Sequence, residues 1–202
     1  MSHTTVYFID KKGHVIEHTD ISDANLINML VWRIIFDLYN DYFINDIERP
    51  EWIPKDHYMD FGDLQMCGDM IPFWHLHMND AVLLDHRIVF ASTFDRVIVM
   101  KEDFPRLIMA YEKFISQMSG EDFKEFFGDF NFDGLKEFVS VVKEFKEDTN
   151  CIGLSTCTSL ISSFWNEYGE DGKYTPYNIF KSKNHSNLFD SFKIKKNVVV
   201  VK

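Results

Sequence analysis

Several side chains that commonly bind metal ions are concentrated between residues 75 and 86. His75 and His77 are separated by one residue, and Asp80 and His86 follow shortly after. On a β-strand, residues i and i+2 face the same side, so this spacing would present two imidazoles to one Zn²⁺ ion. His75, His77, Asp80 and His86 are therefore the candidate ligands of a metal-dependent hydrolase. The alternative is a loop that carries ordinary surface histidines.

The spacing of these residues resembles the H-x-H-x-D-H motif of metallo-β-lactamase-like hydrolases. The sequence departs from that motif at two places, since Asn79 stands where the motif has Asp and Asp80 where it has a further His. The resemblance implies hydrolytic activity, and we keep this as the alternative to a function without catalysis. In the preferred interpretation the protein has no catalytic residue and no cofactor.

Residues 129–134 match the opening D-x-N-x-D-G of an EF-hand calcium loop, in which alternating oxygens converge on a hard cation. Ser140 stands at loop position 12, where the motif needs a bidentate Glu, and Lys136 stands at position 8. The pattern therefore favours a turn between two helices, with Asp133 capping the second.

Cys151 or Cys157 could act as a nucleophile with a histidine as its base, but sequence spacing does not pair them. The chain has no G-x-S-x-G, G-x-G-x-x-G or Walker A motif, so neither a serine nucleophile nor nucleotide binding is indicated. The third cysteine is Cys67, and no C-x-x-C spacing occurs. We expect reduced thiols in a cytoplasmic protein.

Between Asp37 and Asp85, aromatic side chains are interspersed among many acidic ones. This stretch has 11 acidic residues and two basic ones, Arg49 and Lys55, with Trp52, Tyr58, Phe61, Phe73 and Trp74 among them. Carboxylates attract a basic partner, and desolvated aromatic side chains supply binding energy. The alternative is a solvated loop whose aromatic residues face the core. The predicted partner-binding residues are Asp41, Asp46, Glu48, Glu51, Trp52, Asp56, Tyr58, Asp60, Asp63 and Asp69.

The charge of the whole chain is uneven. It has 202 residues with 21 basic and 32 acidic side chains, a net charge of −11. Residues 1–171 form an acidic body, whereas residues 172–202 contain seven Lys and one acid, Asp190. This balance argues against a nucleic-acid binder, which usually carries a basic surface. We therefore predict that nucleic acid is not a partner. No signal peptide or membrane-spanning apolar run is visible, so we also predict that a membrane is not a partner.

The elements that would position these residues follow from hydrophobic periodicity and turn signals. Residues 5–18 and 87–100 are predicted as two β-hairpins, and residues 48–80 as an irregular stretch that could hide short strands. Ser22 is the predicted N-cap of the first helix. The predicted helices are 23–45, 103–118, 121–127, 133–147 and 157–168, and the further strands are 150–154 and 194–201.

These elements predict an α+β protein, with one domain over residues 1–202. Its mixed or antiparallel sheet is formed by two hairpins and a C-terminal strand, and it packs against three to four helices.

In size, acidity and lack of catalytic motifs, the chain resembles the immunity proteins of bacterial contact-dependent or polymorphic toxin systems. The resemblance implies a non-enzymatic cytoplasmic protein that neutralises a basic toxin domain, such as a nuclease. A second alternative is an acidic decoy encoded by a phage or plasmid, which would mimic the phosphates of DNA. That decoy is disfavoured by the Lys and Arg residues after position 86 and by the basic C-terminal segment.

Overall fold

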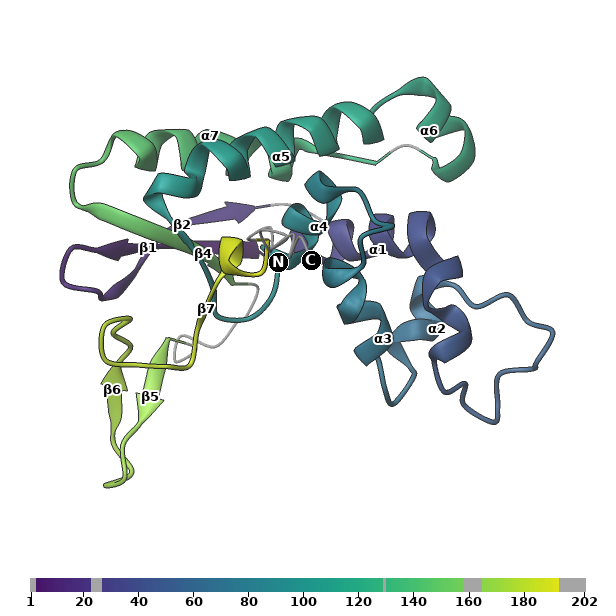
Figure 1. Ribbon diagram of the computed structural model, residues 1–202, viewed down its shortest axis with the longest axis horizontal. Helices are drawn as coiled ribbons and strands as arrows, with labels where there is room; N and C mark the ends of the chain where they lie inside the picture. The colour runs from purple at the N-terminus through teal and green to yellow at the C-terminus, as the bar shows by residue number, and fades with distance from the viewer. Residues whose placement is uncertain (1–2, 23–26, 129, 158–164, 193–202) are drawn as a thin grey trace, which may run out of the picture.

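A mixed five-stranded sheet forms the centre of the protein (Figure 1). The computed structural model describes residues 3–22, 27–128, 130–157 and 165–192. The strand order is β2-β1-β4-β3-β7, antiparallel except for the β3–β7 pair. A separate antiparallel pair is formed by β5 and β6. The strands are β1 His3–Asp10, β2 Val15–Ser22, β3 Val97–Met100, β4 Cys151–Cys157, β5 Asn166–Tyr168, β6 Tyr174–Pro176 and β7 Ser186–Asn187.

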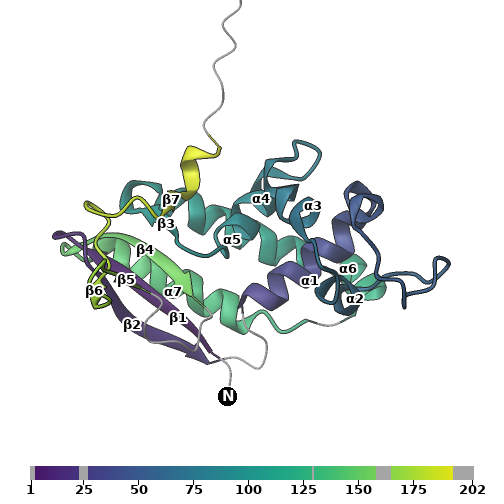
Figure 2. The same ribbon diagram turned by 90° about the horizontal axis from the view of Figure 1, so that it is seen from below.

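Two long helices, α5 and α7, run side by side over one face of this sheet, whereas α1 to α3 gather at the opposite end of the molecule from β5 and β6 (Figures 1 and 2). The helices of the described chain are α1 Ile27–Tyr39, α2 Phe61–Gln65, α3 Ile71–Trp74, α4 Leu84–Ala91, α5 Phe104–Met118, α6 Glu121–Phe127 and α7 Asp133–Glu147. Short 3₁₀ turns occur at Asn40–Tyr42, Ile44–Asp46, His75–Met78, Lys101–Asp103 and Leu188–Asp190.

The sheet separates two hydrophobic clusters, because successive side chains of a strand point to opposite faces. On β1, Val6 packs into the main core, whereas Tyr7 and Ile9 belong to a smaller cluster. In the same way, Val97 and Val99 of β3 face the main core. The smaller cluster is completed by Ile98, Trp165, Tyr177 and Ile179.

Several predicted elements are confirmed. The first hairpin forms as β1 and β2, and Gly13 in its turn has a φ of +83°. Helices α5, α6 and α7 begin and end within a residue of their predicted limits. The α+β class and the mixed sheet are also confirmed. Among the described residues, no helix is both long and apolar enough to cross a membrane.

The second predicted hairpin, over residues 87–100, is wrong. Its second strand exists as β3, but residues 84–91 form helix α4. The side chains of Ile88, Val89 and Phe90 are consecutive and all buried, so this part of α4 does not show the spacing of apolar residues that distinguishes a helix from a strand in sequence. Ile88, Val89 and Phe90 are residue types that are common in strands, and for this reason the sequence indicates a strand here.

The first helix is shorter than predicted. Its described part begins at Ile27 and ends at Tyr39, where two 3₁₀ turns follow. Ser22, the predicted N-cap, is instead the last residue of β2.

The stretch 48–80 forms short helices rather than short strands. Helix α2 begins with a capping box between Asp60 and Asp63, and α3 has a proline in its first turn.

The predictions for the C-terminal quarter are only partly covered by the structure. The predicted helix 157–168 is wrong at both described ends, since Cys157 ends β4 and residues 166–168 form β5. Its middle, 158–164, and the predicted strand 194–201 lie outside the described residues.

Candidate functional site

The ten predicted partner-binding residues lie on the loops and short helices that follow α1. Nine of them are exposed and Asp63 is half-buried. Trp52 is 63% exposed and Tyr58 is 72% exposed, so both aromatic side chains face solvent rather than the core. We call this set the acidic surface: Asp41, Asp46, Glu48, Glu51, Trp52, Asp56, Tyr58, Asp60, Asp63 and Asp69.

Other aromatic residues of the same stretch do not belong to this surface. Phe61 and Phe73 are buried in the main core, and Trp74 packs at its edge. For these three residues the alternative interpretation, in which the aromatic residues of the stretch face the core, is confirmed. Tyr42 and Met66, which the sequence interpretation did not select, are exposed beside the acidic surface.

Buried apolar residues fasten the protruding loop to the core. Ile47, Ile53 and Met59 are each less than 10% exposed, whereas most of the residues between them are exposed. Two tight turns separate these anchors, closed by hydrogen bonds from Ile53 N to Pro50 O and from His57 N to Pro54 O. The loop is therefore an ordered structure on which charged side chains are displayed.

Arg49 holds the loop from inside. Its guanidinium donates to the main-chain oxygens of Pro54 at 2.6 Å and of His57 at 2.8 Å, with a longer contact to Lys55 O at 3.4 Å. One of the two basic side chains of the stretch thus donates its hydrogen bonds to main-chain carbonyl oxygens. This use of Arg49 leaves the surrounding carboxylates without it as an ion-pair partner.

Three acidic residues of the surface have structural roles. Asp60 and Asp63 form the capping box of α2, and Asp69 Oδ1 accepts from Ile71 N at 2.8 Å ahead of α3. The pKa of Asp63 is lowered by the hydrogen bond from Asp60 N and by His57, whose Nε2 lies 2.8 Å from Asp63 Oδ2.

The remaining five carboxylates are free. The side chains of Asp41, Asp46, Glu48, Glu51 and Asp56 form no hydrogen bond or ion pair with any described residue. By contrast, the flanking acids Asp37, Asp80 and Asp85 pair with Arg33, Arg87 and Lys113. Within the stretch from Asp37 to Asp85, the unpaired negative charge therefore lies on residues 41–56.

The candidate metal ligands do not converge. His75 and His77 lie in a 3₁₀ turn, where residues i and i+2 face different directions. His77 Nδ1 lies 2.7 Å from Trp74 O, and Asp80 pairs with Arg87. Throughout the described chain, no three His, Cys, Asp or Glu side chains gather as metal ligands.

His86 is buried in α4, and both of its ring nitrogens have partners. Nδ1 lies 2.8 Å from the Tyr39 hydroxyl, and Nε2 lies 2.8 Å from Gln117 Oε1. Burial lowers the pKa of His86, and the hydrogen bond to Gln117 offsets only part of that decrease. His86 is thus a neutral core residue that links α1, α4 and α5.

The EF-hand-like loop is a helix entry in its described part. Asp133 is the first residue of α7, and Phe132 is its N-cap, so the predicted cap is displaced by one residue. Asn131 Oδ1 accepts from Asp133 N at 2.8 Å, while the Asp133 carboxylate pairs with Lys136 at 3.3 Å. Asp129 lies outside the described residues.

The described cysteine of the candidate nucleophile pair is protected. Cys151 is 2% exposed, and its Sγ donates to Gly153 O at 3.3 Å. Burial raises the pKa of the Cys151 thiol, and the thiolate is the nucleophilic form. The side chain of Cys157 lies outside the description.

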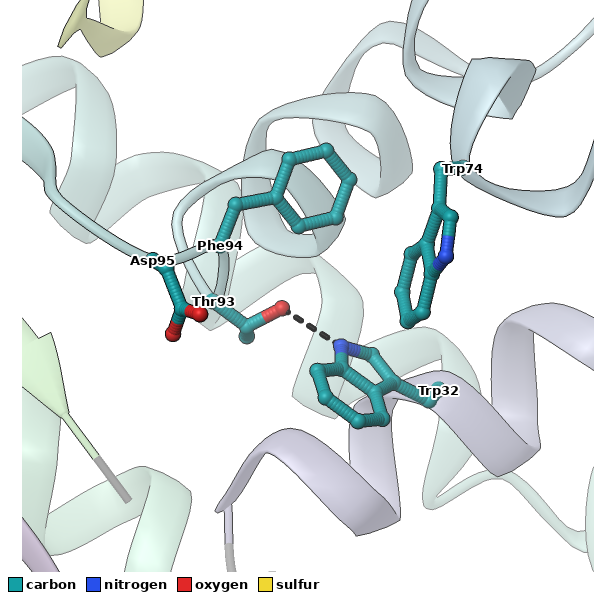
Figure 3. Close-up of a pocket in the computed structure, with 5 residues that line it drawn as sticks. All are labelled: Trp32, Trp74, Thr93, Phe94 and Asp95. Carbon is teal, nitrogen blue, oxygen red and sulfur yellow. Dashed lines mark hydrogen bonds between the residues drawn. The ribbon is translucent and has the colours of Figure 1, made fainter. Parts of the chain in front are cut away.

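An aromatic pocket of about 300 Å³ lies beside the middle of α1 (Figure 3). Its lining comes from three distant parts of the sequence: Trp32 of α1, Trp74 of α3, and Thr93, Phe94 and Asp95 after α4. Sequence reasoning missed this site because only the fold brings the two tryptophans together. In the sequence Trp32 is one more apolar residue of the first helix, so it carries no signal of a pocket.

A scan against protein-family models and searches of curated proteins and of solved structures find no match to this chain. Its function is therefore argued from its own sites.

Proposed function

We propose that this chain is a non-enzymatic binding protein that captures a basic protein partner through the acidic surface. It would neutralise that partner as a toxin-immunity protein does, with a nuclease-like toxin domain as the expected target. The observation that supports the proposal is the ordered loop that presents five unpaired carboxylates together with exposed Trp52 and Tyr58.

Charge and aromatic area would contribute to different steps of binding. Free carboxylates steer a basic protein toward the surface and raise the association rate, an effect that salt weakens. Trp52 and Tyr58 would lose their hydration in the complex and slow dissociation, as aromatic residues at the centre of interfaces commonly do. The partner would replace water around carboxylates that have no internal ion pair to break.

Order in the free protein would add to affinity. Arg49 and the buried anchors Ile53 and Met59 already hold the loop, so less conformational entropy would be lost on binding. Tyr58 is also oriented beforehand, because its hydroxyl accepts from Asn40 Nδ2 at 3.0 Å.

The proposal includes a cytoplasmic location, where such an inhibitor would meet its target. The free thiols of Cys67 and Cys151 are consistent with a reducing compartment.

The test is binding to each basic protein encoded by a neighbouring gene, with lysozyme as a generic basic control. We expect a complex that weakens as salt is raised from about 50 to 300 mM. Trp52→Ala should weaken binding by about 30-fold or more, the loss expected of a hot spot. The matched control is Phe180→Ala, because Phe180 is also exposed but lies on the β6–β7 connection.

The charge contribution is tested by comparing two triple variants. Glu48→Gln, Glu51→Gln and Asp56→Asn together should slow association about tenfold at low salt. Glu125→Gln, Glu137→Gln and Glu144→Gln remove three exposed acids from α6 and α7 and should have little effect. Equal slowing in both would contradict a localised surface, and no complex with the neighbouring protein at low salt would contradict the proposed function.

A further inference from the structure

The aromatic pocket has three aromatic walls, and Trp74 stands nearly at right angles to the other two. The ring centroids of Trp32 and Trp74 are 4.9 Å apart with an interplanar angle of 76°. Trp74 and Phe94 are 5.6 Å apart at 86°. In Figure 3 the Trp32 indole is seen face-on and Trp74 nearly edge-on, so Trp32 forms the floor and Trp74 a side wall.

These walls are held in place without a ligand. The Trp32 indole N–H donates to Thr93 Oγ1 at 2.8 Å, and the Thr93 hydroxyl donates to Phe90 O at 2.6 Å. Trp74 stacks on Phe90 with a centroid distance of 5.9 Å and an angle of 14°. The hydrogen-bonding groups of Trp32 and Thr93 are thereby used inside the protein, and the ligand would meet aromatic surface.

A carboxylate lies at the other end of the pocket from Trp74. Asp95 is exposed and forms no hydrogen bond or ion pair with a described residue. The guanidinium of its neighbour Arg96 lies over the Tyr177 ring, 5.1 Å from the centroid. The pocket thus combines electron-rich aromatic faces with an uncompensated negative charge.

This combination selects one kind of ligand. Aromatic faces attract cations, most strongly in the case of Trp. A primary ammonium could donate to Asp95 but would lose its other hydrogen bonds to water, which the aromatic walls do not replace. A neutral apolar group would make no use of Asp95. A methylated ammonium has a positive charge spread over methyl groups and needs no hydrogen-bond acceptor. We propose that Trp32, Trp74, Phe94 and Asp95 form a binding site for a methylated ammonium group.

This site is independent of the proposed partner binding, because none of its residues belongs to the acidic surface. The same group occurs in small molecules such as choline and in peptides that contain trimethyl-lysine. Both are therefore included in the test. Tighter binding of either one supports the site and identifies the source of the ligand.

The experiment follows the four tryptophan indole N–H signals by NMR during titration of the full chain with choline. We expect saturable shifts of the Trp32 signal with a dissociation constant in the millimolar range or below. The neutral isostere 3,3-dimethylbutan-1-ol has the same shape without the charge and should bind about tenfold more weakly. Equal binding of the isostere, or no saturable shift with choline or the peptide, would overturn the proposal.

Variants locate the site. Trp74→Leu keeps apolar bulk but removes the aromatic face, and it should weaken choline binding about tenfold. Asp95→Asn changes an exposed side chain, retains the fold, and should weaken binding about threefold with reduced salt dependence. The control Trp52→Leu removes an exposed tryptophan from the acidic surface and should leave choline affinity unchanged. If Asp95→Asn binds as the parent does, or Trp52→Leu weakens binding equally, the assignment fails.

Discussion

Arg49 is one of two basic residues among the acids of residues 37–85, and it stabilises the loop that carries most of the acidic surface. Its guanidinium binds the main-chain oxygens of Pro54 and His57, so its role is to close the loop rather than to balance nearby carboxylates. Lys55 lies in the same loop, and its side chain forms no hydrogen bond or ion pair with a described residue. Of the two basic residues of the loop, Arg49 therefore has a structural role and Lys55 does not.

Replacing Arg49 by Ala should loosen the loop while leaving the core intact. Two hydrogen bonds from a charged donor would be lost, and because the side chain is partly solvated the cost should be about 1–2 kcal/mol. Amide hydrogen exchange over residues 53–58 should accelerate, and thermal unfolding should shift down by a few degrees. Lys55→Ala is the control and should change neither measurement. Unchanged exchange in the Arg49 variant would contradict this role.

At the level of single residues, the exposure of the acids could be predicted and the placement of the aromatics could not. Charged side chains are rarely buried, so Glu48 and Glu51 had to face solvent in any fold. Trp52 and Phe61 are both aromatic residues in a stretch without periodicity, yet one is exposed and the other is in the core. The pairing of Trp32 with Trp74 depends on the tertiary fold alone.

Among the elements, the β1–β2 hairpin was predictable and its docking was not. The turn signal at Gly13 and the alternation of β1 specify the hairpin locally. The segment that packs against it comes from far along the chain: Ile179 N donates to Gly13 O at 2.8 Å, and Asn178 Nδ2 donates to Lys12 O at 2.9 Å. Helix α4 could not be predicted from its local sequence, because the consecutive residues Ile88, Val89 and Phe90 are all buried and show no helical spacing of apolar residues.

This docking makes Gly13 a more demanding position than its turn alone. A Cβ at Gly13 would lie 2.6 Å from Phe180 Cδ2 and 2.9 Å from Asn178 Oδ1, whereas one at Gly172 would have no neighbour within 4 Å. Both glycines have positive φ, +83° and +74°. Gly172→Ala should therefore show only the backbone cost, about 1–2 kcal/mol, and Gly13→Ala about 1 kcal/mol more.

The comparison is made by denaturant unfolding of both variants and the parent. Hydrogen exchange at Ile179 should accelerate in Gly13→Ala and not in Gly172→Ala, because only the first disturbs the docked segment. Equal losses of stability with no change at Ile179 would mean that Phe180 and Asn178 move aside without cost.

Across the whole molecule, the sheet is covered on both faces by segments that include a histidine, buried in the case of His86 and half-buried in the case of His185. His86 lies within the main core, between Tyr39 and Gln117, and His185 lies 2.7 Å from the Tyr177 hydroxyl, which belongs to the smaller cluster. Burial lowers the pKa of both side chains below the usual 6.5. Protonation of either histidine therefore favours the unfolded chain, and the two side chains lie in different parts of the structure, at the main core and at the smaller cluster.

The direction of this coupling follows from the lowered pKa values. As the pH falls below about 6.5, the unfolded chain takes up protons that the folded protein does not, so the free energy of unfolding decreases. A second decrease should follow below about pH 4, because the pKa values of Asp10 and Asp63 are lowered from 3.8. Asp37 acts in the opposite sense in that range, since burial raises its pKa.

The contribution of His86 can be isolated by replacing it with Gln, which keeps a polar side chain without a titrating group. His86→Gln should be less stable than the parent at pH 7, because Tyr39 and Gln117 lose well-placed partners. Between pH 7 and 5, however, its stability should fall less steeply, by up to about 1.4 kcal/mol per pH unit at the steepest point. His185 should account for a smaller part of the remaining slope because solvent screens it more. Urea unfolding at several pH values measures both effects, with His75→Gln, which alters an exposed side chain, as the control. A parent-like slope in His86→Gln, or an equally reduced slope in the control, would show that the acid sensitivity arises elsewhere in the molecule.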